Sequence, residues 1–269
     1  MKAVNQKFTL GNTISQEQLD FFNEFGFIHF KSFLSKDEVG EILDRLKEVE
    51  KKWIDANTTK ANGIPLKYGY DHEGNKIVQR FAFANRYDDY LNHFLHDSRF
   101  ELLKTFLPRA DARIAHKEKD GLVVNHYIAT EKSEFTKMGW HTDELRDLFT
   151  VGKLNPMLNI GISLDDSFKE KGGLKLIPGT HKQSIFGMLF RKRYFKDNRP
   201  DPNEIDVETE AGDLTIHSGR IWHRVASASV VGEASRRRVM YFPIVSGAYK
   251  ERDEKSATPL YHHLLFLVK

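Results

Sequence analysis

Near the N-terminus, apolar residues recur with the spacing of a helix. In residues 15–25 they return every three or four positions, and Ser15 with acidic and amide residues behind it forms a capping signature. Gly26 predicts the end of this helix, and "FIHF" directly after it alternates like a short strand. A second amphipathic helix is predicted over residues 34–56, beginning at Ser35.

Beyond about residue 60 the pattern changes to short apolar runs separated by Gly, Asn and Asp. Runs of this length, bounded by turn residues, predict strands. They are "GLVVNHYIA" (121–129), "PMLNIGISL" (156–164), "GGLKLIPG" (172–179), "DLTIHSG" (213–219), "RRRVMYFPIV" (236–245) and "LLFLV" (264–268). Short strands behind a helical layer are typical of a β-sandwich or barrel with helices packed on one sheet. The chain has no repeat or linker, so we expect one domain over residues 1–269.

Composition narrows the possible classes of function. The 269 residues are 40% hydrophobic and include 20 Phe, which is enough for a substantial aromatic core. The net charge of +3 is too small to predict a nucleic-acid partner. Because the chain has no cysteine, any metal would be bound by His and carboxylates. No apolar run is long enough for a signal peptide or a membrane span, so we expect a cytoplasmic protein without a membrane partner. The oligomeric state stays open.

The stretch "KMGWHTDE" (137–144) contains a candidate pair of metal ligands. On a strand, His141 and Asp143 point to the same face, whereas on a helix they would diverge by roughly 200°. The pair can therefore chelate one ion if the segment is extended. A similar triplet, His116-Lys117-Glu118, lies in a polar run and predicts a solvated turn. About two such triplets are expected by chance, so the spacing alone is a weak signal.

Two histidines and one carboxylate, with open positions beside them, are typical of non-haem Fe(II) sites. The third ligand would come from a strand distant in sequence, and both His217 and His223 in "GDLTIHSGRIWHRV" are candidates. Three arginines, Arg236 to Arg238, follow in "SRRRVMYFPI". An arginine that enters an apolar strand needs a carboxylate partner, which a bound dicarboxylate would provide.

Four ordered stretches resemble the phytanoyl-CoA dioxygenase family of Fe(II)/2-oxoglutarate-dependent oxygenases. They are "FFNEFGFIHFKSFLSKDEVGEI", "GWHTD", "NIGISLDDSFKEKGGLKLIPGTHK" and "TEAGDLTIHSGRIWH". Together the four are far more specific than any one of them. The resemblance implies a mainly β fold with flanking helices, a double-stranded β-helix or jelly roll. We expect an N-terminal helical layer on one sheet over residues 1–60 and the jelly-roll core over residues 110–250.

The resemblance also implies the metal site. Fe(II) would be bound by His141, Asp143 and His223, with 2-oxoglutarate and O₂ as cosubstrates. His217 would then be a packed neighbour on its strand. The residues after His223 depart from the small or hydroxylated pattern that is common in the family, because Arg224 and Val225 stand there.

The family places an arginine for 2-oxoglutarate on the strand after the distal histidine. Strand alternation puts Arg236 and Arg238 on one face and Arg237 on the other. We favour Arg236 as the cosubstrate arginine, followed by Arg238. Asn125 and Tyr127 share a face on the strand before "GWHTD" and are further candidates for contact with the cosubstrate.

The implied activity is hydroxylation, or a related oxidation, of an unactivated C–H bond in a small molecule. Family members that halogenate replace the carboxylate ligand with a small residue, so Asp143 favours hydroxylation. Residues 189–200 carry basic residues interleaved with aromatics and predict a solvated loop, or else an anchor for an anionic substrate. In the second case residues 186–206 would form a lid or substrate loop. Two other hypotheses are a catalytically silent jelly-roll binding protein and a zinc hydrolase at the same ligands.

Overall fold

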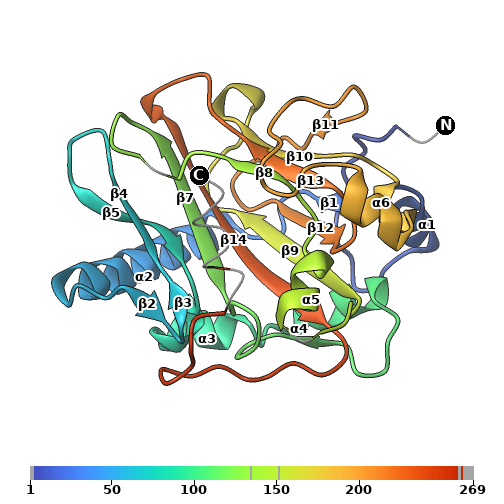
Figure 1. Cartoon of the computed structure of the whole chain (residues 1–269), viewed down its shortest axis with the longest axis horizontal. Coiled ribbons are helices and arrows are strands. Elements are labelled where there is room, and N and C mark those ends of the chain that lie inside the picture. Colours follow the sequence, from blue (N-terminus) through green and yellow to red (C-terminus); the bar gives the residue numbers. More distant parts are fainter. Residues whose placement is uncertain (1–2, 134, 151, 260–261, 263–269) are drawn as a thin grey trace.

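The computed structural model describes residues 3–133, 135–150, 152–259 and 262 (Figure 1). The helices are α1 (Gln16–Phe25), α2 (Lys36–Asp55), α3 (Asp89–Phe94), α4 (Ser98–Leu103), α5 (Asp147–Thr150) and α6 (Ile185–Phe190). The strands are β1 (Phe27–Phe30), β2 (Lys60–Ala61), β3 (Ile64–Pro65), β4 (Lys67–Tyr70), β5 (Lys76–Phe81), β6 (Arg113–Ile114), β7 (Val123–Ala129), β8 (Met138–His141), β9 (Met157–Ser163), β10 (Gly173–Leu176), β11 (Ile205–Asp206), β12 (Leu214–Ser218), β13 (His223–Ala226) and β14 (Gly232–Val245). The closing strand expected at 264–268 lies outside the described residues.

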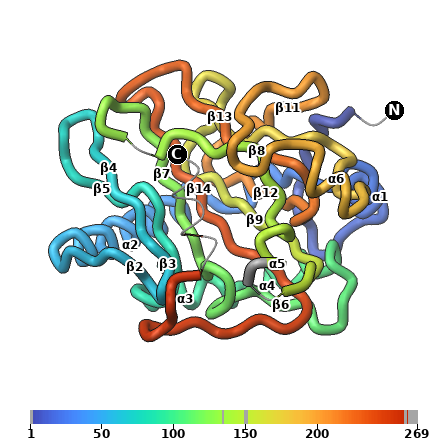
Figure 2. The backbone as a smooth tube through the Cα atoms, viewed as in Figure 1, coloured from blue at the N-terminus to red at the C-terminus, as the bar shows by residue number. Residues whose placement is uncertain are grey.

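Two antiparallel sheets form the centre of the molecule. The larger sheet has the order β1-β12-β9-β14-β7-β5-β4, with β6 paired to β14, and the smaller sheet has the order β11-β10-β13-β8. Figure 2 shows β7, β14 and β9 side by side although they are far apart in the sequence, as their ladders require. From β7 to β10, and again from β11 to β14, successive strands alternate between the two sheets, which is the arrangement of a double-stranded β-helix. The predicted fold is confirmed.

Capping residues set the start of both N-terminal helices, and a glycine ends the first. Ser15 and Ser35 each accept a hydrogen bond from a backbone N–H three residues later, and the residue at that position closes a capping box. Gly26 ends α1 at a φ of 80°, a left-handed conformation that glycine adopts without steric cost. Helix α2 buries an apolar stripe that ends at Trp53.

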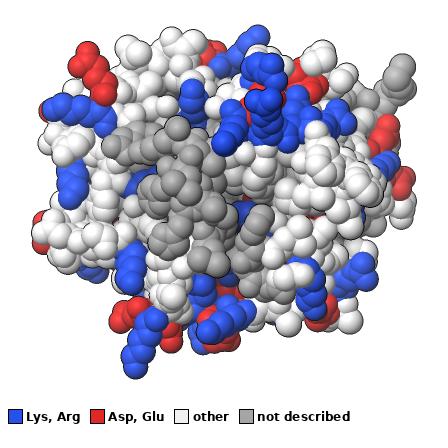
Figure 3. All heavy atoms as spheres, viewed as in Figure 1, with Lys and Arg blue, Asp and Glu red and all other residues white. Residues whose placement is uncertain are grey.

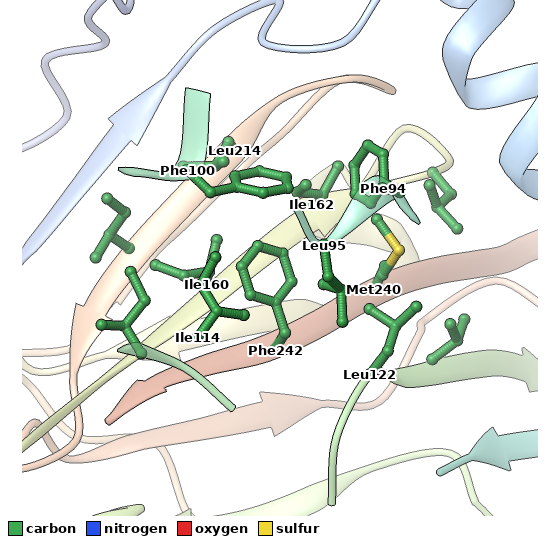
Figure 4. Close-up of a cluster of buried hydrophobic side chains, with 14 of the residues drawn as sticks. Phe94, Leu95, Phe100, Ile114, Leu122, Ile160, Ile162, Leu214, Met240 and Phe242 are labelled. Carbon is green, nitrogen blue, oxygen red and sulfur yellow. The ribbon is translucent and has the colours of Figure 1, made fainter. Parts of the chain in front are cut away.

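The hydrophobic core lies between the large sheet and the helices. Alternate residues of β14 and β9, including Met240, Phe242 and Ile160, point to the helical side. Figure 4 shows them with Phe94 and Phe100, and the rings of Phe100 and Phe242 meet edge to face with centroids 4.8 Å apart. The residues between them on each strand must face the smaller sheet, and the polar ones among these line the candidate site.

Among the described residues, no helix combines the length and the apolar character that crossing a bilayer would need.

Candidate metal centre

His141, Asp143 and His223 converge between the two sheets. His141 ends β8, His223 begins β13, and these two residues are directly paired across the strands. Their ring centroids lie 4.1 Å apart. Asp143 follows β8, and its Oδ2 lies 3.8 Å from the Nε2 of His223. One ligand atom from each of the three residues falls within 4.8 Å of the others, which is close enough for one shared ion.

Backbone carbonyls fix the orientation of both imidazoles. The Nδ1 of His141 lies 2.8 Å from the oxygen of Gly139, and the Nδ1 of His223 lies 3.1 Å from the oxygen of Ile221. A carbonyl oxygen only accepts, so each Nδ1 carries the hydrogen. Each Nε2 is therefore left with a lone pair for a metal, as ligating histidines require.

Burial and neighbouring charges set the protonation that a divalent metal needs. Burial lowers the pKa of His141 to about 4, and burial with the adjacent His141 charge holds the pKa of His223 well below its usual value. Burial alone would raise the pKa of Asp143, but His217, His223 and Arg146 hold it well below its usual value. At neutral pH the site therefore offers two neutral imidazoles and one carboxylate.

Polar residues on the large sheet complete the surroundings of Asp143. Asn159 on β9 donates a 2.9 Å hydrogen bond to its Oδ2. His217, which is paired with Asn159 across β12 and β9, is 1% exposed, with its Nε2 3.5 Å from the same oxygen. Neither ring nitrogen of His217 has a hydrogen-bond partner among the described residues. His217 is therefore a packed neighbour of the candidate ligands: its Nε2 faces Asp143, and its Nδ1 is unused.

The structure separates the three arginines of β14. Arg237 faces the smaller sheet, opposite Tyr127 on β7, and its guanidinium carbon lies 4.2 Å from the centre of that ring. The side chain is 1% exposed, and its Nη2 has no hydrogen-bond partner among the described residues. No described carboxylate pairs with Arg237, and burial lowers its pKa. Its one hydrogen bond goes to the oxygen of Lys171, at 3.4 Å.

Arg236 and Arg238, the arginines favoured from the sequence, lie on the opposite face of β14. Arg236 forms hydrogen bonds of 2.6 and 2.7 Å to Glu233, and Arg238 forms bonds of 2.7 and 2.8 Å to Asp165. Both guanidinium groups therefore already have carboxylate partners, on the side of the sheet that α2 covers. The sheet itself separates them from the candidate ligands.

Asn125 and Tyr127 lie on the inner face of β7, as strand alternation predicted. Both line the same cavity as the candidate ligands. The Oδ1 of Asn125 and the hydroxyl of Tyr127 are buried without a hydrogen-bond partner among the described residues. These unused polar atoms, like those of His217 and Arg237, are what a polar ligand would satisfy.

The second histidine–acid triplet has a different environment. His116 stacks on His96 with ring centroids 4.3 Å apart, and Glu118 forms an ion pair with Arg113. In the described part of the chain, the group of metal-binding side chains that comes together is His141, Asp143 and His223.

The segment after α6 closes over the candidate ligands. Phe195 stacks on His141 with ring centroids 4.7 Å apart, and its backbone N–H donates to the oxygen of Trp140. The predicted lid or substrate loop, residues 186–206, thus contacts β8 directly. The indoles of Trp140 and Trp222 pack in a separate apolar cluster with Ile177.

Gly139 is the point at which β8 and this segment meet. A Cβ at Gly139 would lie 2.2 Å from the oxygen of Phe195, so we expect Gly139→Ala to displace the ring that covers His141. Overpacking of this kind costs about 1–3 kcal/mol, and the melting temperature should fall by several degrees. Gly40→Ala is the control, because nothing lies within 4 Å of that Cβ on an exposed face of α2. It should leave the melting temperature unchanged or raise it. Equal melting temperatures for wild type and Gly139→Ala would contradict the contact.

A cavity of about 640 Å³ opens beside the three candidate ligands. It is lined by polar residues of the large sheet, including Asn125, Asn159 and Tyr241, and by Phe195. Gly161 leaves room for the Tyr241 ring, because a Cβ there would lie 2.8 Å from it. A volume of this size suits a small-molecule ligand together with a cosubstrate.

The model of the phytanoyl-CoA dioxygenase family matches residues 22–238, which include all three candidate ligands. The chain belongs to the phytanoyl-CoA dioxygenase family. The resemblance predicted from the four sequence motifs is therefore confirmed. The chain is also similar to a probable alpha-ketoglutarate-dependent hypophosphite dioxygenase from Stutzerimonas stutzeri. It is 23% identical over 227 residues, which cover 78% of this chain and 71% of the relative.

Solved structures share the fold of this phytanoyl-CoA dioxygenase family member. EvdO2 from Micromonospora carbonacea var. aurantiaca, complexed with 2-oxoglutarate, has a TM-score of 0.61 at 14% identity, over 92% of this chain and 98% of EvdO2. The carbocyclase SnoK of nogalamycin biosynthesis has a TM-score of 0.64 at 17% identity, over 92% and 90% of the two chains. The epimerase SnoN, in complex with Fe³⁺, alpha ketoglutarate and nogalamycin RO, has a TM-score of 0.63 at 18% identity, over 91% and 92%. The expected cofactors, iron and 2-oxoglutarate, agree with the family, with what these proteins carry and with the donor set of the site.

Proposed function

We propose that this protein is an Fe(II)- and 2-oxoglutarate-dependent dioxygenase that hydroxylates, or otherwise oxidises, a C–H bond of a small molecule. The observation that carries the proposal is the convergence of His141, Asp143 and His223 in one buried cavity. Three protein ligands of this kind leave coordination positions open, which suits non-haem Fe(II). A catalytically silent binding protein would have no need for a complete ligand set.

The residues around the candidate ligands also fit 2-oxoglutarate. The guanidinium of Arg237 is buried without a carboxylate partner among the described residues, and an isolated buried charge is costly. The distal carboxylate of 2-oxoglutarate would satisfy it through bidentate hydrogen bonds. We therefore propose Arg237, in place of the initially favoured Arg236 or Arg238, as the cosubstrate arginine, with Tyr127 and Asn125 beside it. A zinc hydrolase would leave this arginine unexplained.

When bound, iron and 2-oxoglutarate would supply the oxidising chemistry: 2-oxoglutarate and O₂ become succinate and CO₂ as the substrate gains one oxygen atom. The chain itself orients the groups and excludes water. The Gly139 and Ile221 carbonyls hold the two imidazoles, Asn159 holds Asp143, and Phe195 covers His141. Such fixed partners typically contribute 10–100-fold in metal affinity or activity.

A small-molecule substrate is supported by the cavity and by the relatives, whose names refer to hypophosphite and to steps of nogalamycin biosynthesis. The carbocyclase and epimerase show that this fold hosts several oxidative outcomes. Hydroxylation is the outcome that we propose, because the carboxylate ligand Asp143 is present. Residues 186–206, which provide Phe195 to the cavity wall, would help to select the substrate.

Anaerobic addition of Fe(II) and 2-oxoglutarate tests the proposal. We expect a weak visible charge-transfer band that needs both additions, and succinate in stoichiometric amounts with consumed O₂ when air is admitted. Zn(II) in place of Fe(II) is the control and should give neither signal. The absence of both the band and succinate with Fe(II) would overturn the assignment as an oxygenase.

A further inference from the structure

We propose that the substrate is a small organic oxyanion, and that its anionic group binds at Arg80 and Arg146 inside the cavity. This inference rests on the proposed oxygenase function, since it names the substrate class of the same site. The shared chemistry is a phosphonate, sulfonate or carboxylate group, and the experiment below separates these three.

The charge of the cavity wall is the first observation. Seven basic side chains line it against two acidic ones, Asp120 and Asp143. The basic residues are Lys67, Lys76, Arg80, Lys119, Lys132, Lys137 and Arg146. On the face of the molecule shown in Figure 3, other Lys and Arg side chains gather around β8 and β11. A concave wall of one sign concentrates ligands of the opposite charge.

The arrangement of two guanidinium groups is the second observation. Arg80 Nη2 lies 2.6 Å from Asp120 Oδ2, and Arg146 Nη1 lies 3.4 Å from the same oxygen. Both guanidinium groups thus lie at the carboxylate of Asp120, on the wall of the cavity. The Nη1 of Arg80 is buried and has no hydrogen-bond partner among the described residues. An oxyanion would provide the missing acceptor.

The position of this arginine pair relative to the metal ligands is the third observation. Arg146 Nη2 lies 3.7 Å from Oδ1 of Asp143, so Arg146 is the member of the pair that lies beside the candidate iron site. On the large sheet, Arg80 is paired with Asn125, and Arg237 is paired with Tyr127 on the same strand. Arg80 and Arg237 therefore lie two strands apart, about 10 Å given the spacing of strands. The orphan nitrogen of Arg80 is thus distinct from the arginine that we propose for 2-oxoglutarate.

Apolar side chains and solvent-exposed lysines form much of the remaining cavity wall. Phe135, Leu174 and Val225 give it apolar surface. Lys67, Lys132 and further lysines of the wall are exposed to solvent, where they would steer an anion toward the buried pair. A small organic anion would use the orphan nitrogen of Arg80, the apolar surface and the basic rim together.

Anaerobic calorimetry with chosen probes tests the proposal. Ethylphosphonate, propanesulfonate and butyrate would be titrated into protein that holds Fe(II) and saturating 2-oxoglutarate, with butyramide as the neutral probe. We expect at least one anion to bind at least tenfold more tightly than butyramide, and more weakly in 500 mM than in 50 mM NaCl. Arg80→Gln should weaken that anion about tenfold or more, and Arg80→Lys should recover part of the loss. The anion that binds best identifies the class of head group.

Arg113→Gln is the matched control, because Arg113 forms a comparable ion pair with Glu118 but does not line the cavity. It should leave anion binding unchanged. Equal affinity for butyramide, unchanged anion affinity in both Arg80 variants, or no binding by any of the three anions would each overturn the proposal. The charge-transfer band separates this result from the proposed function. If the wild type gave no charge-transfer band but still bound anions in a way that depends on Arg80, the proposed oxygenase function would be wrong and the proposed anion site would stand.

Discussion

Asp143→Ala is expected to abolish iron binding at micromolar concentrations and to lower succinate formation by about a thousandfold or more. The carboxylate is the one charged ligand of the candidate site, and burial makes its replacement by water unfavourable. Metal-ion catalysis contributes several kcal/mol, and about 4 kcal/mol corresponds to a thousandfold in rate. His223→Ala should have an effect of the same size, because it removes the Nε2 lone pair that this tautomer offers to the metal.

His116→Ala and Glu118→Gln provide the controls for this prediction, since they alter the other histidine–acid triplet. That triplet stacks on His96 and pairs with Arg113, away from the candidate ligands. Bound iron would be measured after gel filtration, and succinate would be measured at saturating 2-oxoglutarate. If Asp143→Ala keeps one equivalent of iron and its turnover, the ligand assignment is wrong.

Local patterns were sufficient to predict the elements that depend on neighbours in sequence. The capping boxes at Ser15 and Ser35 and the terminating Gly26 are properties of four or five consecutive residues, and all three occur as expected. The His141–Asp143 spacing likewise needs only an extended backbone. By contrast, the sequence analysis did not predict α3 or α4, which complete the helical face of the core.

The arginine of β14 shows what local patterns cannot determine. Alternation separates Arg237 from Arg236 and Arg238, but it does not say which face is inside, because both faces of this strand are covered. Pairing with β7 decides the matter, and that ladder shifts its register between Gly232 and Arg237. The apolar residues farther along β14, such as Met240 and Phe242, could have indicated which face is covered by the helices. They share the face of Arg236 and Arg238, which is the face that packs on the helices.

Substitution of Arg237 should have the opposite effects on 2-oxoglutarate affinity and on stability from substitution of Arg238. Arg237→Met should weaken 2-oxoglutarate binding about a hundredfold, since loss of one partner from a buried, hydrogen-bonded charge pair costs roughly 2–5 kcal/mol. Without 2-oxoglutarate, however, the wild-type guanidinium is buried with no carboxylate partner among the described residues. Replacing it by an apolar side chain of similar length should therefore leave the melting temperature of the ligand-free protein unchanged, or raise it.

Arg238→Met and Arg236→Met should show the reverse. Arg238 forms a bidentate pair with Asp165, and Arg236 forms one with Glu233. Each substitution therefore leaves a carboxylate without its partner. The carboxylate of Asp165 is partly buried, whereas that of Glu233 is exposed. We expect Arg238→Met to lower the melting temperature and Arg236→Met to change it little, with 2-oxoglutarate affinity kept in both. The affinity would be read from the charge-transfer band under anaerobic conditions, and the KM for 2-oxoglutarate should rise in Arg237→Met alone. If Arg238→Met bound 2-oxoglutarate a hundredfold more weakly and Arg237→Met kept the wild-type affinity, the cosubstrate would have to bind on the outer face of β14. That outcome would require the strand to pair in another register, because in the present register the sheet stands between Arg238 and the candidate ligands.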